Sequence, residues 1–113
     1  MFDSVTSVAL TSALGDLAVR QRAIADNISN VNTPNYHAKV VTFENALKAS
    51  VAAGDGHAAA TTSASLAPTQ LNGNNVNLDT ETLANIDTVL RYQFASQAAS
   101  AQFAAVRAAM RTS

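Results

Sequence analysis

Residues 25–36 of the chain read Ala25-Asp26-Asn27-Ile28-Ser29-Asn30-Val31-Asn32-Thr33-Pro34-Asn35-Tyr36. The segment before them has helical periodicity, and Pro34 ends it because proline donates no backbone hydrogen bond and forces Thr33 out of the helical region. Asparagine tolerates a left-handed backbone and bonds nearby peptide groups, so Asn30 and Asn35 suit a helix end. Asn27 lies one turn before Asn30, where its amide can tie the exiting loop back. The stretch predicts the end of a helix and a turn that directs the chain in a fixed direction. An ordinary loop at the end of a helix would explain the same residues.

The composition favours helices that bury little within one molecule. The 113 residues allow one domain, 1–113, in which 24 residues are alanine and only 26 are Leu, Ile, Val or Phe. An alanine-rich chain forms helices readily but has little apolar volume for a core of its own. We therefore expect a subunit that completes its packing against neighbours. The net charge of −1 without a basic cluster gives nucleic-acid binding no electrostatic support.

Several classes of protein lack support in this sequence. There is no cysteine, so disulfides and thiolate metal sites are excluded. The first residues, Met1 to Val5, have neither a cationic segment nor a continuous apolar run, and no secretory signal is visible. No stretch has the length and apolarity of a membrane span. These features alone are typical of a cytoplasmic protein.

The first long helix is predicted over residues 4–29, with apolar residues spaced alternately by four and three positions. The stripe consists of Leu10, Leu14, Leu17, Gln21, Ile24, Ile28 and Val31, with Gln21 as its one polar interruption. The charged residues Asp16, Arg20, Arg22 and Asp26 fall off this stripe. A partner helix and a plain amphipathic helix on a small core both explain the pattern.

Residues 30–48 are predicted to hold the turn and a short helix. Residues 37–43 can run extended, and Thr42 can cap a helix from Phe43 to about Val51. Residues 49–71 contain mostly Ala, Gly, Ser and Thr, with a Gly54-Asp55-Gly56 turn. Because this segment offers little to bury, we expect a flexible linker there.

A second long helix is predicted over residues 79–111, after an Asn72-Gly73 turn and with Asn77 or Asp79 as its cap. It carries two apolar stripes, whereas a helix in a two-helix hairpin needs one. One stripe is Leu83, Ile86, Leu90, Phe94, Ala98, Ala101 and Ala105; the other is Val89, Tyr92, Ala99, Phe103, Val106 and Met110. The extra stripe indicates a further partner, and Tyr92 fits either an interface or a half-buried core position. Packing against other helices is expected of Leu10, Leu14, Leu17, Ile24, Ile28, Leu83, Ile86, Leu90, Phe94, Phe103, Val106 and Met110.

No catalytic constellation is present. His37 and His57 are the only imidazoles, and no cluster with ligand spacing accompanies either one. The oxygen-bearing residues around Asn72 and Glu81 invite a calcium interpretation, which we reject because two carboxylates without a matching loop fall short of a site. There is no phosphate-binding glycine loop and no nucleophile motif. We expect no enzyme activity, no cofactor, no metal and no small-molecule substrate.

The turn motif resembles the N-terminal signature of the bacterial flagellar axial proteins, the family of rod, hook and hook-junction subunits. The matching residues are Ala25, Asn27, Ile28, Asn30, Thr33, Pro34, Asn35 and Tyr36. Asn35 stands where that family usually has glycine, and asparagine is the next most permissive residue for a positive φ.

A second motif is similar to the proximal-rod members of the same family. It comprises Asn72, Gly73, Asn74, Asn75 and Val76, followed by Leu90, Arg91, Tyr92 and Gln93. The resemblance implies an all-α fold: an antiparallel, coiled-coil-like hairpin of the two long helices, joined through the turn, the short helix and the linker.

The same resemblance implies a structural subunit of the proximal rod in the flagellar basal body. Such a subunit polymerises through its terminal helices, transmits torque, and is exported by the flagellar type III apparatus without a cleaved signal. The implied partners are further copies of the chain, FliE, the FliF ring and FlgC. The alternative is a secreted or cytoplasmic helical-hairpin adaptor that binds a single partner.

Overall fold

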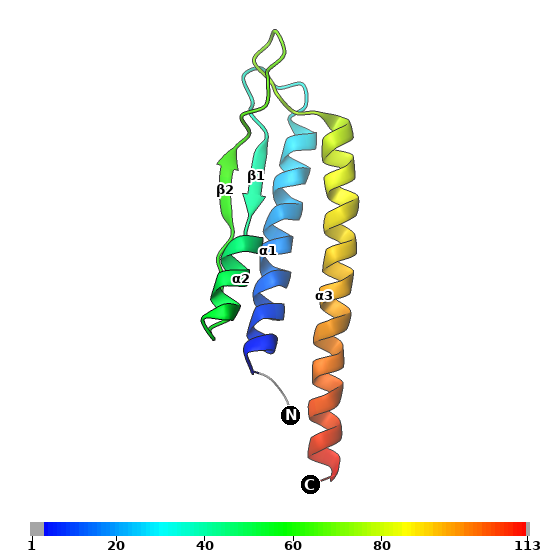
Figure 1. Cartoon of the computed structure of the whole chain (residues 1–113). Helices are drawn as coiled ribbons and strands as arrows, with labels where there is room; N and C mark the ends of the chain where they lie inside the picture. The colour runs from blue at the N-terminus through cyan, green and yellow to red at the C-terminus, as the bar shows by residue number, and fades with distance from the viewer. Residues whose placement is uncertain (1–3, 113) are drawn as a thin grey trace.

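The computed structural model describes residues 4–112, which form three helices and two short strands (Figure 1). In chain order they are α1 (Ser4–Ser29), β1 (Lys39–Thr42), α2 (Glu44–Ala52), β2 (Thr61–Ala64) and α3 (Leu78–Thr112). The molecule is a thin rod with principal extents of 66 × 25 × 14 Å. The two long helices cover nearly the ranges expected from the sequence, with α3 one residue longer at each end.

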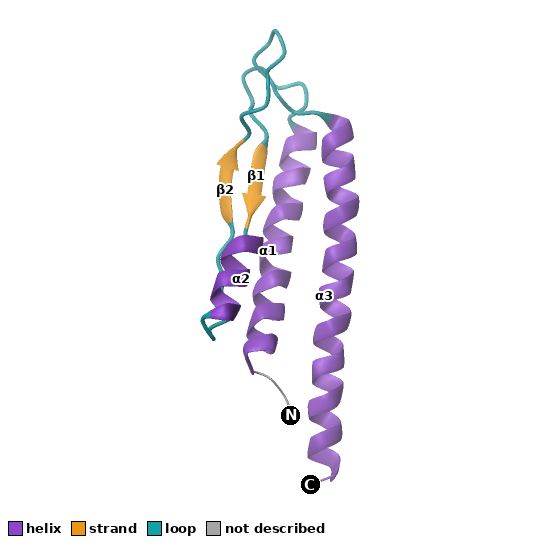
Figure 2. Ribbon diagram, viewed as in Figure 1, coloured by secondary structure: helices purple, strands orange, loops and turns teal. Residues whose placement is uncertain are grey.

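Helix α1 lies at the centre, with α3 antiparallel along one side. Along another side lie β1, α2 and β2, which belong to the segment that we call the arm, residues 37–71 (Figure 1). The long terminal helices pack together as predicted. The expectation of an all-α fold was wrong, however, because a small antiparallel sheet accompanies the helices (Figure 2). Lys39 pairs with Ala64 and Thr42 with Thr61.

The seam between the two long helices is formed on α3 by one carboxylate and two small side chains. Glu81, Thr88 and Ala95 are buried at intervals of seven residues on α3, and Glu81 bonds Asn27 of α1, so this face is turned toward α1. On α1, Leu10 lines a pocket with residues of α3, and Leu17 and Ile24, which follow it at seven-residue intervals on the same face, are buried. Thr88 and Ala95 are small, so they let the two helix backbones approach closely at their level. The seam is therefore narrow, and it uses only one face of α3.

The expected flexible linker, residues 49–71, holds secondary structure and docks on α1. It contains the end of α2 and the whole of β2. Ser12 Oγ on α1 donates a hydrogen bond to the Ala58 carbonyl (2.8 Å) and accepts one from the Ala58 N–H (3.0 Å). Gly56, at φ 87°, lies so close to α1 that a Cβ atom there would stand 2.8 Å from the Val5 carbonyl oxygen. Backbone contacts thus anchor this segment, although it has few large apolar side chains. Such contacts cannot be predicted from the number of apolar residues in the segment.

Of the two helix caps predicted from the sequence, the one for α3 is confirmed and the one for α2 is not. Asn77 caps α3, since its Oδ1 accepts hydrogen bonds from the N–H groups of Asp79 (3.0 Å) and Thr80 (3.2 Å). The predicted Thr42 cap of α2 was wrong. Thr42 belongs to β1, and Phe43 precedes the helix without a side-chain cap.

Within residues 4–112, none of the helices combines the length and the apolar character needed to cross a lipid bilayer.

Candidate functional site

The turn after α1 is built around Asn27, whose side chain is fully buried. Its Oδ1 accepts hydrogen bonds from the Lys39 N–H (2.8 Å) and the Tyr36 hydroxyl (3.1 Å). Its Nδ2 donates to the Lys39 carbonyl (3.0 Å) and to Glu81 Oε1 (2.7 Å). The amide therefore ties the exiting loop back to the helix, as predicted, and in addition joins α1 to α3.

Two asparagines of the second motif complete the network from the other side. Asn74 is fully buried, and its Nδ2 donates to the carbonyls of Asn30 and Thr33, each at 2.8 Å. Asn75 accepts a hydrogen bond from the Ala38 N–H (2.7 Å) and donates to the Ser65 carbonyl (3.0 Å). Each amide satisfies backbone groups that no helix or sheet serves. The two sequence motifs, about 40 residues apart, thus form one structure that we call the amide network: Asn27, Asn74, Asn75 and their partners.

The loops of the two motifs touch at Asn35 and Gly73. Asn35 has φ 63°, which confirms the predicted left-handed conformation, and its N–H donates to the Asn72 carbonyl (2.9 Å). Gly73 has φ 84°, and a Cβ atom there would collide with Asn35 Oδ1. Only glycine meets both the backbone angle and the close approach at position 73.

Glu81 brings a carboxylate into the amide network. It is 7% exposed, and this burial raises its pKa, while the hydrogen bond from Asn27 opposes the rise. Asn27 is thus placed to hold the helix pair and the loop together at one point.

A charged cluster links the short helix to both long ones. Arg20 pairs with Glu44 through two hydrogen bonds of 2.6 and 2.7 Å, and its guanidinium also donates to the Val41 carbonyl. Its Cζ lies 4.9 Å from the centre of the Phe43 ring. Arg91 reaches the same Glu44 at 3.3 Å from α3. The bond from Arg20 lowers the pKa of Glu44 to about 2.

The predicted turn motif divides into inward and outward residues. Asn27 is buried, while Asn30 and Tyr36 are half-buried within the network. Asn30 also donates to the Asp26 carbonyl and accepts from the Thr33 hydroxyl. The remaining motif residues are exposed: Ala25, Ile28, Thr33, Pro34 and Asn35.

The second motif divides in the same way. Its first part, Asn72, Gly73, Asn74, Asn75 and Val76, lies in or against the amide network, with Val76 3% exposed. In its second part, Arg91 joins Glu44 and Asp87, whereas Leu90, Tyr92 and Gln93 are exposed on α3.

The residues expected to pack between helices fall into three groups. Leu17 and Ile24 are buried in the seam. Leu10, Leu14 and Val106 are half-buried, and Ile28 is at the border of exposure. The others are exposed, and four of them define what we call the outer stripe of α3: Leu83, Ile86, Leu90 and Phe94, at 68%, 53%, 60% and 77% exposure. Phe103 and Met110 are also exposed, at 71% and 72%.

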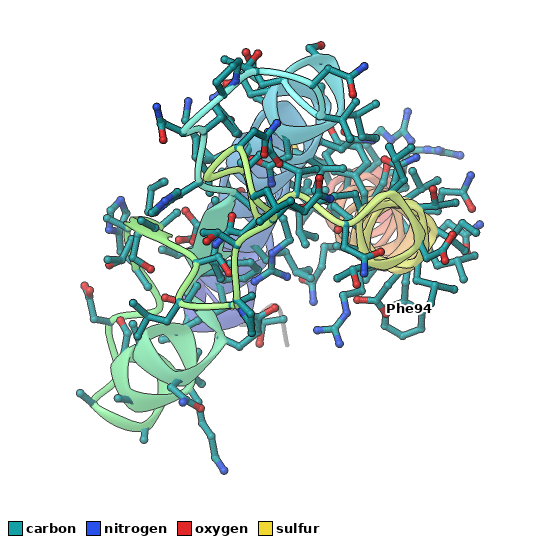
Figure 3. The ribbon with its side chains drawn as sticks, turned by 90° about the horizontal axis from the view of Figure 1, so that it is seen from above. Phe94 is labelled. Atoms are coloured by element: carbon teal, nitrogen blue, oxygen red, sulfur yellow. The ribbon has the colours of Figure 1, made fainter. Side chains whose placement is uncertain are left out.

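The outer stripe does not face α1. Figure 3 shows Phe94 projecting from α3 into open space beside the helix. The apolar residues lie three or four positions apart, which places them on one side of the helix. The side of α3 that contacts α1 carries smaller or polar groups instead, and periodicity alone could not say which stripe faced which helix.

Three polar residues of α1 serve a role that the sequence did not reveal. Ser12, Asp16 and Arg20, four positions apart, form a polar stripe that contacts the arm. Asp16 and Arg20 lie off the apolar stripe of α1. The four-residue spacing of these polar residues shows that they share one face of α1. The spacing does not show whether that face is exposed to solvent or hydrogen-bonded to another segment.

The polar contacts described above hold segments of the chain together. Across residues 4–112, no group of three or more His, Asp or Glu side chains could hold a metal ion. The amide network and the charged cluster instead fix the relative positions of α1, α3 and the arm.

Comparisons with known proteins agree with the turn motif. The family described as flagella basal body rod protein matches residues 9–37. Flagellar basal body rod protein FlgB of Bacillus subtilis (strain 168) is 47% identical over 38 residues, which are 34% of this chain and 30% of that protein. The matched part therefore spans less than a third of the relative's length. Over its N-terminal part the chain is thus similar to a flagellar basal body rod protein, FlgB, which confirms the resemblance predicted from the turn motif.

Proposed function

We propose that the chain is a structural subunit of the proximal rod in a flagellar basal body. Two findings support this: the similarity to basal body rod proteins over residues 9–37, and a thin shape in which α3 leaves large apolar residues exposed. The observation that carries the proposal is the outer stripe, with Leu83, Ile86, Leu90 and Phe94 all more than half exposed.

The outer stripe favours packing against other molecules. Monomeric proteins seldom expose contiguous large apolar patches, and such patches mark interaction sites. Here the large apolar residues of α3 are outside while small ones form the seam, which is the reverse of a hairpin that folds to hide its own core. A neighbouring helix would bury the outer stripe in coiled-coil fashion.

Torque transmission is the mechanical role that we infer. A contact between two different faces of identical subunits does not close on itself and gives a helical filament. Loads pass from subunit to subunit only if each keeps its shape, and the amide network holds α1, α3 and the arm in one geometry. The role is structural, without enzyme activity, cofactor or small-molecule substrate.

The partners proposed on the family resemblance are further copies of the chain, FliE, the FliF ring and FlgC. The proposed location is the rod of the basal body, reached through the flagellar type III apparatus.

The test uses a double variant, Leu90→Ser with Phe94→Ser, in a bacterium whose own rod gene of this kind has been replaced by the gene for this chain. We expect swimming in soft agar to be lost and basal bodies to lack an assembled rod, while the protein is still made and helical. The matched control is Leu66→Ser with Leu71→Ser, because both leucines are fully exposed in the arm.

Unchanged swimming of the outer-stripe variant would contradict the proposal. A purified chain that forms a one-to-one complex with a single partner, without open-ended self-association, would favour the helical-hairpin adaptor instead.

A further inference from the structure

A pocket of about 610 Å³ lies beside the first half of α1, on the side of the arm. Its walls include Ser7, Thr11 and Gly15 of α1 and residues 57–60 of the arm. Most of the lining residues are small, and the volume leaves room for a long side chain from outside. No residue of the amide network or the outer stripe lines it.

Asp16 lines this pocket with an unpaired carboxylate oxygen. The residue is 7% exposed, and among the described residues Oδ2 has no hydrogen-bond partner. The nearest arginine on the same helix, Arg20, is already committed to Glu44. The Ala60 backbone donates a hydrogen bond to the Asp16 carboxylate, so Oδ2 is the oxygen left without a partner. A buried carboxylate oxygen without a partner is destabilising, and a cation from another molecule would relieve that cost.

The chain presents a suitable cation at the far end of α3. Arg20, Lys39 and Arg91 are held in ion pairs within the molecule. Arg107 and Arg111 are exposed on the last turns of α3, four residues apart and therefore on one face. An arginine stem packs on small apolar groups while its guanidinium pairs with a carboxylate, which is the chemistry that the pocket offers.

The same molecule cannot supply this arginine. Val106 lines a separate pocket with Ser7 between α1 and α3, so Arg107 stands near the level of Ser7. Asp16 lies nine residues further along α1, about 14 Å away along the axis at 1.5 Å per residue. The Asp16 pocket shares Ser7 and Thr11 with that pocket, but its remaining walls come from α1 and the arm, and no residue of α3 lines it.

We propose that the Asp16 pocket receives Arg107 from α3 of a second copy of this chain, displaced along the helix axis by about 14 Å. The contact joins two different faces, so it repeats from copy to copy without closing. The inference rests on the proposed rod function and deepens it, because it names the residues of one subunit contact.

A charge exchange tests the pairing in the purified full chain. Asp16→Lys and Arg107→Glu should each weaken self-association at least tenfold, measured by sedimentation over a range of concentrations. The two variants mixed one to one, or combined in one chain, should recover to within about threefold, because a tenfold change corresponds to about 1.4 kcal/mol and the exchange restores that interaction. Arg22→Glu, an exposed arginine of α1, is the matched control. Failure of the exchange to restore association, with helix content intact by circular dichroism, overturns the pocket contact.

Asp16→Asn separates an interface role from a purely structural one. Because the unpaired carboxylate destabilises the isolated chain, the neutral amide should raise the unfolding midpoint of the dilute protein and at the same time weaken self-association. A lower midpoint together with unchanged association would overturn the proposal.

Disulfide trapping tests the geometry, since the chain has no cysteine of its own. Gly15→Cys and Ala104→Cys chains, mixed under oxidising conditions, should form a mixed dimer, because Ala104 lies one turn from Arg107 and a Cβ atom at position 15 meets nothing within 4 Å. Gly15→Cys with Ser96→Cys should not. Self-association without the first cross-link overturns only this contact, whereas a wild-type chain that never self-associates contradicts the proposed function as well.

Discussion

At the scale of single residues, the asparagine side chain explains the turn. One planar amide carries both a donor and an acceptor, so Asn27 satisfies the N–H and the carbonyl of Lys39 together. Alanine offers neither group, and aspartate would place a second carboxylate beside Glu81. The buried amide therefore pairs with both backbone groups of one residue, as a neighbouring strand would, at a place where the chain changes direction.

Replacing Asn27 by alanine should lower the free energy of unfolding by about 3 kcal/mol, because several buried partners lose their hydrogen bonds at once. Urea unfolding followed by circular dichroism measures the change. The control is Asn32→Ala at an exposed position of the same turn, which should stay within about 0.5 kcal/mol. Equal effects of the two variants would contradict the role given to the amide network.

Glu44 gives the chain an acid-sensitive contact. Its pKa is lowered from 4.5 to about 2 by the bond from Arg20, so its contribution is complete above pH 4.5 and is lost as the pH falls toward 2. The unfolding midpoints of the wild type and of Glu44→Gln should therefore converge on acidification through this range. Burial raises the pKa of Glu81, which acts in the opposite sense, and the comparison between the two proteins removes that effect. A constant difference from pH 7 to pH 2 would rule out this account.

At the scale of elements, small residues decide which segments lie together. Gly56 lets the arm approach α1, Gly73 lets the two loops touch, and Ala95 lets α3 approach α1. Close backbone contact and hydrogen bonds hold the elements, while the larger apolar side chains of α3 stay outside. The arm is consequently a docked part of the fold.

Two glycine substitutions should have opposite effects. Gly73→Ala should destabilise the chain by about 2 kcal/mol, because it combines a strained φ with a collision against Asn35. Gly15→Ala should stabilise it by about 0.5–1 kcal/mol, since position 15 is helical and open. Thermal unfolding of both variants under the same conditions checks the pair, and stabilisation by Gly73→Ala would contradict the loop contact.

At the scale of the whole molecule, a rod of 66 × 25 × 14 Å has much surface for its volume. Helix α1 is flanked by α3 and the arm, whereas α3 is covered on the side that meets α1 and exposes the outer stripe. Association with neighbouring molecules would bury the outer stripe, which a single copy leaves exposed.

The helix content and melting temperature should therefore rise with protein concentration. Circular dichroism melts from micromolar to millimolar concentration would show the rise for the wild type, and a much smaller one for the Leu90→Ser, Phe94→Ser variant. Identical melts at all concentrations would contradict stabilisation by assembly.

The sequence by itself determined the local structure. Helical periodicity, Pro34 and the asparagines around it specified where α1 ends, and the sequence offered Asn77 or Asp79 as the cap of α3, of which Asn77 is the observed one. Helix ends and caps are predictable because they depend on neighbouring backbone groups. Residues 37–43 were predicted to be able to run extended, and Lys39–Thr42 form β1. The spacing of apolar residues also predicted that α3 has more apolar side chains than a single seam can bury.

Only the tertiary structure decided how these parts meet. It placed Asn74 and Asn75 on the turn after α1, set Arg20 on Glu44, paired β2 with β1, and turned the small face of α3 toward α1. These choices depend on contacts between residues tens of positions apart and on close backbone approach. Neither long-range contacts nor close backbone approach produces a periodic pattern in the sequence. Both stabilise the fold only once the segments lie side by side.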